Sequence, residues 1–400
     1  MPPTCYNGKI LHIDLSSAKT WVETPPEEFY RKYGGGSGMG SYYILKELPR
    51  GVDALSPKNI LTLFLGVPTG LPISGQSRMT ANAKSPLSGA IGDSQCGGFF
   101  PAEMKFAGYD GIVIRGKSPK PVYLWIKDGE VEIRDASHIW GKITGEAEDI
   151  IKKELGDDKI EVVQIGPAGE KLVRIANMVN MVNRANGRTG MGAVMGSKNL
   201  KAVAVRGSQK MTPADPQRFA QLFREGTQRI PQVSGIDFLH EHGTTGDVAG
   251  MHAAGGLPTR NFNEGQFEGY ETIAGELMTE TILKDRDTCF SCTVRCKRVV
   301  ETEFMNRHVM PRYGGPEYET MATLGSYCGV SDMHAVALGN QLCNQYGLDT
   351  ISTGATIAFA MECFENGLIS QSDTDGIDLR FGNAEAMVRM IEMIGKRQGF

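Results

Sequence analysis

Short alternating or continuous apolar stretches dominate the first half of the chain and predict β-strands. The clearest hairpin is predicted where residues 122–126 and 131–134 flank Asp128-Gly129, a pair that readily adopts the positive φ angles of a tight turn. A second hairpin is predicted where residues 9–15 and 20–23 meet at a serine turn. The remaining predicted strands are residues 60–65, 111–115, 162–165 and 202–206.

After residue 212 the pattern changes, because apolar residues now recur at helical spacing. The predicted helices are residues 213–229, 333–346, 353–365 and 384–396. This change predicts an α+β protein with two domains. Residues 1–210 are expected to form a β-rich domain and residues 211–400 a mainly α-helical domain.

The composition narrows the class of protein. The chain has 400 residues and 50 glycines, which occur in clusters rather than at every third position, so a collagen-like repeat is excluded. Hydrophobic residues make up 40% of the chain and aromatic residues 8%, which excludes a disordered chain and indicates a globular protein. With 42 basic and 46 acidic residues the net charge is −4, so we expect no nucleic-acid partner.

No targeting or membrane-spanning segment is expected. The N-terminus lacks the basic stretch and following apolar core of a signal peptide. No apolar run approaches the roughly 18 residues that a membrane span needs. We therefore expect a cytoplasmic protein with reduced cysteines. In such a protein a tight cysteine cluster indicates a metal site rather than disulfides.

Three cysteines form the strongest chemical signal in the chain. Cys289, Cys292 and Cys296 have the spacing C-x2-C-x3-C, which lets one short loop place three sulfurs around a metal cluster. Three cations are expected to offset the charge of the thiolates, namely Arg295, Lys297 and Arg298. An iron-sulfur cluster competes here with a set of unliganded cysteines and with a zinc site, whose fourth ligand would be His308, Cys328 or Cys343.

The glycine clusters do not match the usual nucleotide motifs. The chain has no G-x-x-x-x-G-K-[ST] sequence, and Gly190–Gly196 has one residue too many for the dinucleotide fingerprint. Glycine-rich turns nevertheless allow backbone N–H groups to approach a phosphate. The clusters therefore indicate a larger cofactor that several loops contact.

Several longer segments carry a resemblance to a known family. They are residues 89–98, 105–111, 165–170 and 188–202, the Cys289 cluster, and residues 315–320 and 346–350. In this order they resemble the tungsten-containing aldehyde:ferredoxin oxidoreductase family over essentially the whole chain. Members hold one tungsten between the dithiolenes of two pyranopterins of the molybdopterin type, beside a 4Fe-4S cluster. They oxidise aldehydes to carboxylic acids and pass the electrons outward.

The resemblance implies a role for each matching residue. Arg78 would lie between pterin and cluster, and backbone near four residues would hold the pterin phosphates and a bridging magnesium: Gln95, Gly97, Arg184 and Ala185. The family's motif D-x-x-G-L-D is matched by Asn344, Gly347, Leu348 and Asp349, with Asn in place of the first Asp. Cys289, Cys292 and Cys296 would be three of the four cluster ligands.

The resemblance also implies the catalytic groups. Glu319 would be the general base, and Tyr318 would orient the aldehyde carbonyl. Independently of the resemblance, Glu317 is expected to be a helix-start carboxylate that the N-terminal dipole stabilises. Family members are longer and carry a second motif, D-x-x-G-L-C, with the fourth cluster cysteine, so we expect this chain to lack the family's C-terminal part.

The expected partners follow from the electron flow. The chain has no second cysteine cluster, so a ferredoxin or ferredoxin-like iron-sulfur subunit would accept the electrons, and a further flavin subunit is a possible addition. The family also implies a homodimer or hetero-oligomer. Two alternative functions stay open, a tungsten-dependent aromatic acyl-CoA reductase subunit and a non-catalytic iron-sulfur electron carrier. The sequence does not distinguish tungsten from molybdenum.

Overall fold

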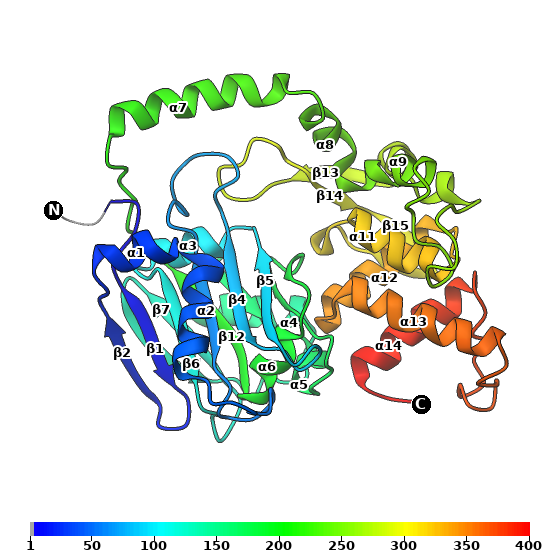
Figure 1. The fold of residues 1–400 in the computed structure, drawn as a ribbon, viewed down its shortest axis with the longest axis horizontal. Helices are drawn as coiled ribbons and strands as arrows, with labels where there is room; N and C mark the ends of the chain where they lie inside the picture. The colour runs from blue at the N-terminus through cyan, green and yellow to red at the C-terminus, as the bar shows by residue number, and fades with distance from the viewer. Residues whose placement is uncertain (1–3) are drawn as a thin grey trace. The chain divides into compact units, whose positions relative to one another are not determined.

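The structure, a computed structural model, describes residues 4–400 and divides into two compact units (Figure 1). The first unit contains the chain up to Arg229 together with Cys289–Thr293, and the second contains Ile230–Thr288 and Val294–Phe400. The first unit holds two large sheets, and the second is mainly helical. The predicted α+β class, with a β-rich first part followed by a helical part, is therefore confirmed.

Two six-stranded sheets form the first unit. The strands of one sheet are β1 (Ile10–Asp14), β2 (Lys19–Glu23), β3 (Leu61–Leu65), β4 (Met79–Lys84), β5 (Ile91–Cys96) and β6 (Gly111–Arg115), in the order β2-β1-β6-β3-β4-β5. The other sheet contains β7 (Val122–Lys127), β8 (Glu130–Asp135), β9 (Glu161–Gln164), β10 (Met178–Asn180), β11 (Arg184–Asn186) and β12 (Leu200–Arg206), in the order β11-β10-β9-β12-β7-β8. The neighbours β1 and β6, and likewise β7 and β12, run parallel, whereas all other pairs are antiparallel.

The two sheets share one apolar core between them. Leu63 of β3 and Ile112 of β6 meet Leu124 of β7 and Val203 of β12 in this core. Successive side chains of a strand point to opposite faces, so the intervening residues, such as Phe64, pack on helices instead. The helices of this unit are α1 (Glu27–Tyr33), α2 (Gly36–Glu47), α3 (Phe100–Phe106), α4 (Thr144–Leu155), α5 (Pro167–Glu170), α6 (Met191–Ser197) and α7 (Pro216–Arg229).

These layers follow from the apolar runs of the sequence. The α1 and α2 helices cover the outer face of the first sheet, and α4 covers that of the second. Strands buried on both faces read as continuous apolar segments, as Leu61–Leu65 does. The predicted hairpin is β7–β8, and its turn has φ 48° at Asp128 and 92° at Gly129. The other predicted strands and the serine-turn hairpin are also confirmed, with small shifts of their ends.

The second unit is built from helices and two short hairpins. Its helices are α8 (Ile236–His242), α9 (Asp247–Ala253), α10 (Gly275–Thr281), α11 (Tyr318–Thr320), α12 (Met333–Tyr346), α13 (Thr350–Glu365) and α14 (Ala384–Lys396). Its strands are β13 (Leu283–Asp287), β14 (Lys297–Val300), β15 (Thr302–Phe304) and β16 (Arg307–Val309). The cysteine segment joins β13 to β14. Three of the four predicted helices are α12, α13 and α14, and the fourth is α7 of the first unit, each with small shifts of its ends at most. Among residues 4–400 no helix combines the length and apolarity that a membrane span requires.

Candidate functional site

A glycine turn after β5 brings predicted cofactor and cluster residues into contact. A Cβ atom added to Gly97 would lie 2.7 Å from the Cys289 sulfur, so only glycine leaves room for this thiol. Gly98 follows with φ 101°, in the region that favours glycine. Its carbonyl accepts hydrogen bonds from the Ser77 hydroxyl (2.7 Å) and the Phe290 N–H (3.2 Å). The cysteine segment is thus seated on the turn that carries Gly97.

Asn180 at the end of β10 holds this turn beside the next hairpin. Its side chain is fully buried, and its amide nitrogen donates to the carbonyls of Gly97 (3.2 Å) and Arg184 (3.1 Å) and to the sulfur of Cys96 (3.3 Å). One amide therefore brings together two predicted cofactor segments, Gly97 and Arg184-Ala185. The sequence interpretation missed Asn180. Asparagine at every third position from Asn177 to Asn186, between mainly apolar residues, is the signal that could have found it.

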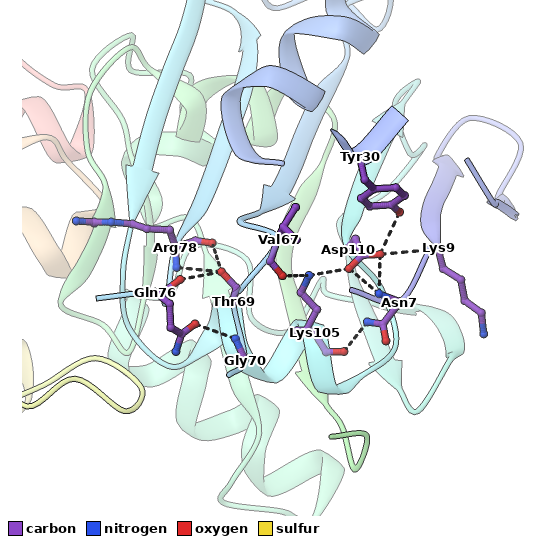
Figure 2. A network of polar contacts seen from close by, with 10 residues as sticks. All are labelled: Asn7, Lys9, Tyr30, Val67, Thr69, Gly70, Gln76, Arg78, Lys105 and Asp110. Carbon is purple, nitrogen blue, oxygen red and sulfur yellow. Dashed lines mark hydrogen bonds and ion pairs between the residues drawn. The ribbon is translucent and has the colours of Figure 1, made fainter. Parts of the chain in front are cut away.

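A polar network holds the segment that leads to Arg78 (Figure 2). The hydroxyl of Thr69 donates to the carbonyls of Gln76 (2.9 Å) and Arg78 (3.3 Å). The Gln76 amide oxygen accepts the N–H of Gly70 at 2.8 Å. Figure 2 shows the Arg78 side chain extending away from this network, and it is exposed. The network therefore fixes the Arg78 backbone and leaves its guanidinium accessible.

Two guanidinium groups and a second thiol act electrostatically on the buried thiol of Cys96. Burial raises the pKa of Cys96 to about 12, and the neighbouring Cys289 sulfur adds to this effect. The charges of Arg78 and Arg184 oppose it. These groups lie close enough to influence one another electrostatically, which favours an anionic group at this place. Gln95 is exposed on β5, where its amide donates to the Ser37 hydroxyl at 3.4 Å.

The three clustered cysteines are divided between the units. Cys289 and Cys292 belong to the first unit and Cys296 to the second. The structure contains no disulfide among the eight cysteines, all of which it describes. Within residues 4–400, no three His, Cys, Asp or Glu side chains form a group that could hold a metal ion. An iron-sulfur cluster spreads its thiolates further apart than a single ion does, so the predicted cluster stays a prediction.

The zinc alternative gains no support from its proposed fourth ligands. Burial raises the pKa of both Cys328 and Cys343, which keeps their thiols protonated and poor as metal ligands. The Cys328 thiol donates to the Thr323 carbonyl at 3.3 Å. The imidazole of His308 instead pairs with Glu301 at 3.1 Å.

Each of the three cations expected to offset the thiolate charge also has another partner, and the compensation itself stays a prediction. Lys297 forms an ion pair with Glu317 at 3.0 Å, and Arg295 forms one with Asp285 at 3.4 Å. Arg298 donates to three backbone carbonyls, those of His240, Glu241 and Arg295. Burial lowers the pKa of Arg298, and the Glu317 carboxylate and the Cys296 sulfur oppose that shift.

Glu317 lies directly before α11, at the helix start where it was expected, and its stabilisation by the helix dipole stays a prediction. Its carboxylate accepts from Lys297 (3.0 Å) and from the hydroxyl of Thr244 (2.5 Å). The Thr244 hydroxyl in turn accepts the Tyr318 N–H at 2.9 Å. Glu317 is therefore occupied in positioning the start of α11.

Tyr318 and Glu319 form the first turn of α11, which continues into a π-helical segment, Met321–Gly325. Such π turns are rare and occur frequently at functional sites. Glu319 is exposed, and Tyr318 is half-buried. Burial, together with the nearby carboxylates of Glu319 and Asp247, raises the pKa of Tyr318. The phenol therefore stays protonated at neutral pH and can donate a hydrogen bond.

The second predicted pterin motif forms the junction between α12 and α13. Gly347 ends α12 with φ 72°, and Leu348 is fully buried. The Asp349 carboxylate caps α13 by accepting the N–H groups of Ile351 (3.0 Å) and Ser352 (3.3 Å). The Asn344 amide donates to the Tyr313 carbonyl at 2.9 Å. These side chains thus have structural roles within the second unit.

Two glycines of α6, within a cluster expected to face a cofactor, allow this helix to pack closely on neighbouring backbone. A Cβ atom on Gly192 would lie 2.1 Å from the Asn177 carbonyl oxygen, and one on Gly196 would lie 2.0 Å from the Gly169 carbonyl oxygen.

Among the predicted site residues, the structure brings together Arg78, Gly97, Arg184 and Cys289 in the first unit, and Tyr318 and Glu319 in the second.

Comparison with known proteins agrees with the resemblance over the whole chain. Residues 10–207 match the profile of the aldehyde ferredoxin oxidoreductase N-terminal domain, and residues 220–400 match that of domains 2 and 3 of this family. The chain is 43% identical to the tungsten-containing aldehyde ferredoxin oxidoreductase of Pyrococcus abyssi over 99% of its length. It is 31% identical to the aliphatic sulfonate oxidoreductase WOR-like subunit of Pyrococcus furiosus over 98% of its length. The chain spans 65% of the length of each of these relatives.

A solved structure shares the fold. The active-site complex BamBC of benzoyl coenzyme A reductase, in complex with 1,5-dienoyl-CoA, matches with a TM-score of 0.86 and 30% sequence identity. The match covers 99% of this chain and 61% of that chain.

Proposed function

Because the chain belongs to the aldehyde ferredoxin oxidoreductase family, we propose that the protein is a tungsten pterin oxidoreductase that oxidises aldehydes to carboxylic acids and passes the electrons through a 4Fe-4S cluster to a ferredoxin. The observation that supports this most strongly is the packing of the Cys289 sulfur against Gly97. A predicted cluster ligand there touches the turn expected to hold a pterin.

The residues of the first unit suit the proposed cofactor. Because Gly97 has no Cβ atom, the Cys289 thiol packs directly on the backbone of the turn that is proposed to hold a pterin. The exposed guanidinium of Arg78 can donate to phosphate or pterin acceptors. We propose that Gln95, Gly97, Arg184 and Ala185 hold one pterin and a magnesium ion. The junction of Asn344, Gly347, Leu348 and Asp349 is the corresponding proposal for the second pterin.

When bound, the tungsten pterin would supply two-electron redox chemistry. The proposed reaction converts an aldehyde and water into a carboxylic acid, two protons and two electrons. Glu319 is the proposed base, since its carboxylate is exposed and can accept a proton from water or substrate. Tyr318 donates a hydrogen bond to the carbonyl oxygen, because its raised pKa keeps the hydroxyl protonated. Glu317 cannot share this work while Lys297 and Thr244 hold it.

Metal analysis and activity together test the proposal. The protein, purified without oxygen, is expected to contain tungsten and iron at about one and four atoms per chain, and to reduce a viologen dye with aldehydes. If the protein contains molybdenum in place of tungsten, the identity of the metal in the proposal changes and the proposed reaction stays the same. Iron without tungsten or molybdenum would instead favour the non-catalytic electron carrier.

Variants then test the proposed catalytic groups. Glu319→Gln is expected to lower kcat about 100-fold or more at unchanged tungsten content, because the general base is lost. Tyr318→Phe is expected to lower it about tenfold, since one hydrogen bond to the substrate disappears. Glu303→Gln, a change of an exposed carboxylate on β15, is the matched control. Full activity of Glu319→Gln would remove this residue from the mechanism.

The second candidate function is reduction of an aromatic acyl-CoA. The BamBC complex favours it, because this chain matches that structure with a TM-score of 0.86. Acyl-CoA reduction at low potential, with no oxidation of free aldehydes, would establish this alternative. The same neighbour and the WOR-like subunit support a proposed multi-subunit assembly, in which a ferredoxin-like or flavin subunit takes the electrons.

A further inference from the structure

The tip of the cysteine loop is held by the first unit through Phe290. This residue lies between Cys289 and Cys292, and the segment Cys289–Thr293 belongs to the first unit although the flanking chain belongs to the second. Its ring makes edge-to-face contacts with two phenylalanines of that unit. The ring centroids lie 5.5 Å from Phe106 and 6.1 Å from Phe99, with interplanar angles of 73° and 88°.

The backbone of Phe290 is held on both sides. Its N–H donates to the Gly98 carbonyl at 3.2 Å, and its carbonyl accepts from the Gln76 side chain at 3.4 Å. Gln76 is buried, and the N–H of Gly70 holds its amide oxygen at 2.8 Å (Figure 2). Its amide nitrogen is thereby left to donate to the Phe290 carbonyl. Gln76 thereby links the network that ends at Arg78 to the cysteine loop.

A further pair holds the end of the tip. The Ser74 hydroxyl accepts a hydrogen bond from the Thr293 N–H at 3.0 Å and forms a second hydrogen bond with the Thr293 hydroxyl at 2.9 Å. The tip is thus held by ring contacts, by hydrogen bonds to backbone and by hydrogen bonds to side chains, all made by residues 74–106. Together these contacts hold the backbone on both sides of Phe290.

We propose that Phe290 and Gln76 are positioning residues that set the Cys289 and Cys292 thiols in place before a cluster binds. A ligand loop that is already ordered loses less conformational entropy on binding and holds the cluster in one geometry. The proposal rests on the proposed function only in taking these thiols as cluster ligands. Neither residue touches the reacting atoms, so both act through the cysteines.

Amide hydrogen exchange tests the ordering of the loop directly. In Phe290→Ala, the amide exchange rates of residue 290, Cys292 and Thr293 are expected to rise at least about tenfold, because a packed ring is lost. Phe290→Leu should restore part of the protection. Gln76→Glu keeps the acceptor for Gly70 but removes the donor to Phe290, and should raise exchange about fivefold. The matched control is Phe359→Ala on α13, whose ring is 61% exposed.

The cluster itself provides the second measurement. In the iron-loaded protein, Phe290→Ala and Gln76→Glu are expected to change the electron paramagnetic resonance spectrum and the midpoint potential. They should also accelerate iron loss to a chelator at least about fivefold, with thermal unfolding as in Phe359→Ala. Unchanged exchange in both variants would overturn the proposal, as would raised exchange with an unaltered cluster. A protein without iron would overturn the proposed function instead, and exchange would still decide whether Phe290 anchors the loop.

Discussion

The contact between Gly97 and Cys289 gives a prediction that can be worked out from the structure. The φ angle of Gly97 lies outside the left-handed region, so alanine can adopt the same backbone conformation. An alanine methyl group would nevertheless lie 2.7 Å from the Cys289 sulfur, where heavy atoms in contact prefer about 3.5–4.0 Å. Either the thiol must turn or the backbone must shift. Overpacking of this size lowers the free energy of unfolding by about 1–3 kcal/mol.

A double-mutant cycle isolates that contact. Cys289→Ala removes the sulfur, and the next atoms then lie at 3.6 Å (the Ser77 carbonyl oxygen) and 3.8 Å (the Cys289 Cβ), which are ordinary contacts. Gly97→Ala should therefore cost nearly nothing in the Cys289→Ala background, so the coupling energy should equal the whole penalty of about 1–3 kcal/mol.

Urea unfolding of the metal-free protein measures the four stabilities of this cycle. Gly226→Ala is the control, since a Cβ there meets nothing within 4 Å in helix α7. It is expected to stabilise the protein by up to about 1 kcal/mol. The reasoning is refuted if Gly97→Ala is as stable as the wild type, or if its penalty persists without the Cys289 sulfur.

Three further predictions concern buried or capping side chains. Asn180→Ala removes the donor shared by two carbonyls and a thiol, and should lower the free energy of unfolding by about 3 kcal/mol in urea; less than about 1 kcal/mol would contradict its linking role. Asp349→Ala should lower the free energy of unfolding by about 1 kcal/mol because the helix cap is lost, whereas Asp349→Asn keeps the cap. If Asp349→Asn loses tungsten at unchanged stability and the α12 cap variant Asp332→Asn does not, Asp349 makes a separate cofactor contact. Retained tungsten in Asp349→Asn would argue against such a contact. Burial lowers the pKa of Lys198 from 10.5 to about 8, so between these pH values the folded protein binds fewer protons than the unfolded chain and its stability rises with pH. Relative to Lys198→Met, the free energy of unfolding of the wild type should therefore increase by about 2–3 kcal/mol from pH 7 to pH 10. Urea midpoints that change in parallel for the two proteins would contradict this.

Local patterns could be predicted from the sequence because their causes are local. Asp128-Gly129 specifies its hairpin through backbone angles that few other residue pairs adopt. Leu61–Leu65 reads as a buried strand since both of its faces are covered. The cysteine spacing likewise identifies a candidate metal loop from eight adjacent residues.

The supporting side chains could not be predicted in this way. Gln76 and Phe290 are 214 residues apart, and nothing near either residue in the sequence indicates the other. Glu317 lies at a helix start, as its sequence predicts, but its ion pair with Lys297 of β14 joins residues 20 apart and is not indicated by the sequence. Such roles depend on tertiary contacts, which a single sequence does not record.

The path of the chain also bears on how the protein folds. The chain leaves the first unit after Arg229 and returns to it only for Cys289–Thr293. The contacts of Ser74 with Thr293 and of Gln76 with Phe290 close loops of 219 and 214 residues. Closing such long loops is entropically costly and slow, so these contacts should form after the sheets of the first unit. During synthesis, the cysteines would then emerge after the residues that receive them and dock onto a surface that is already folded.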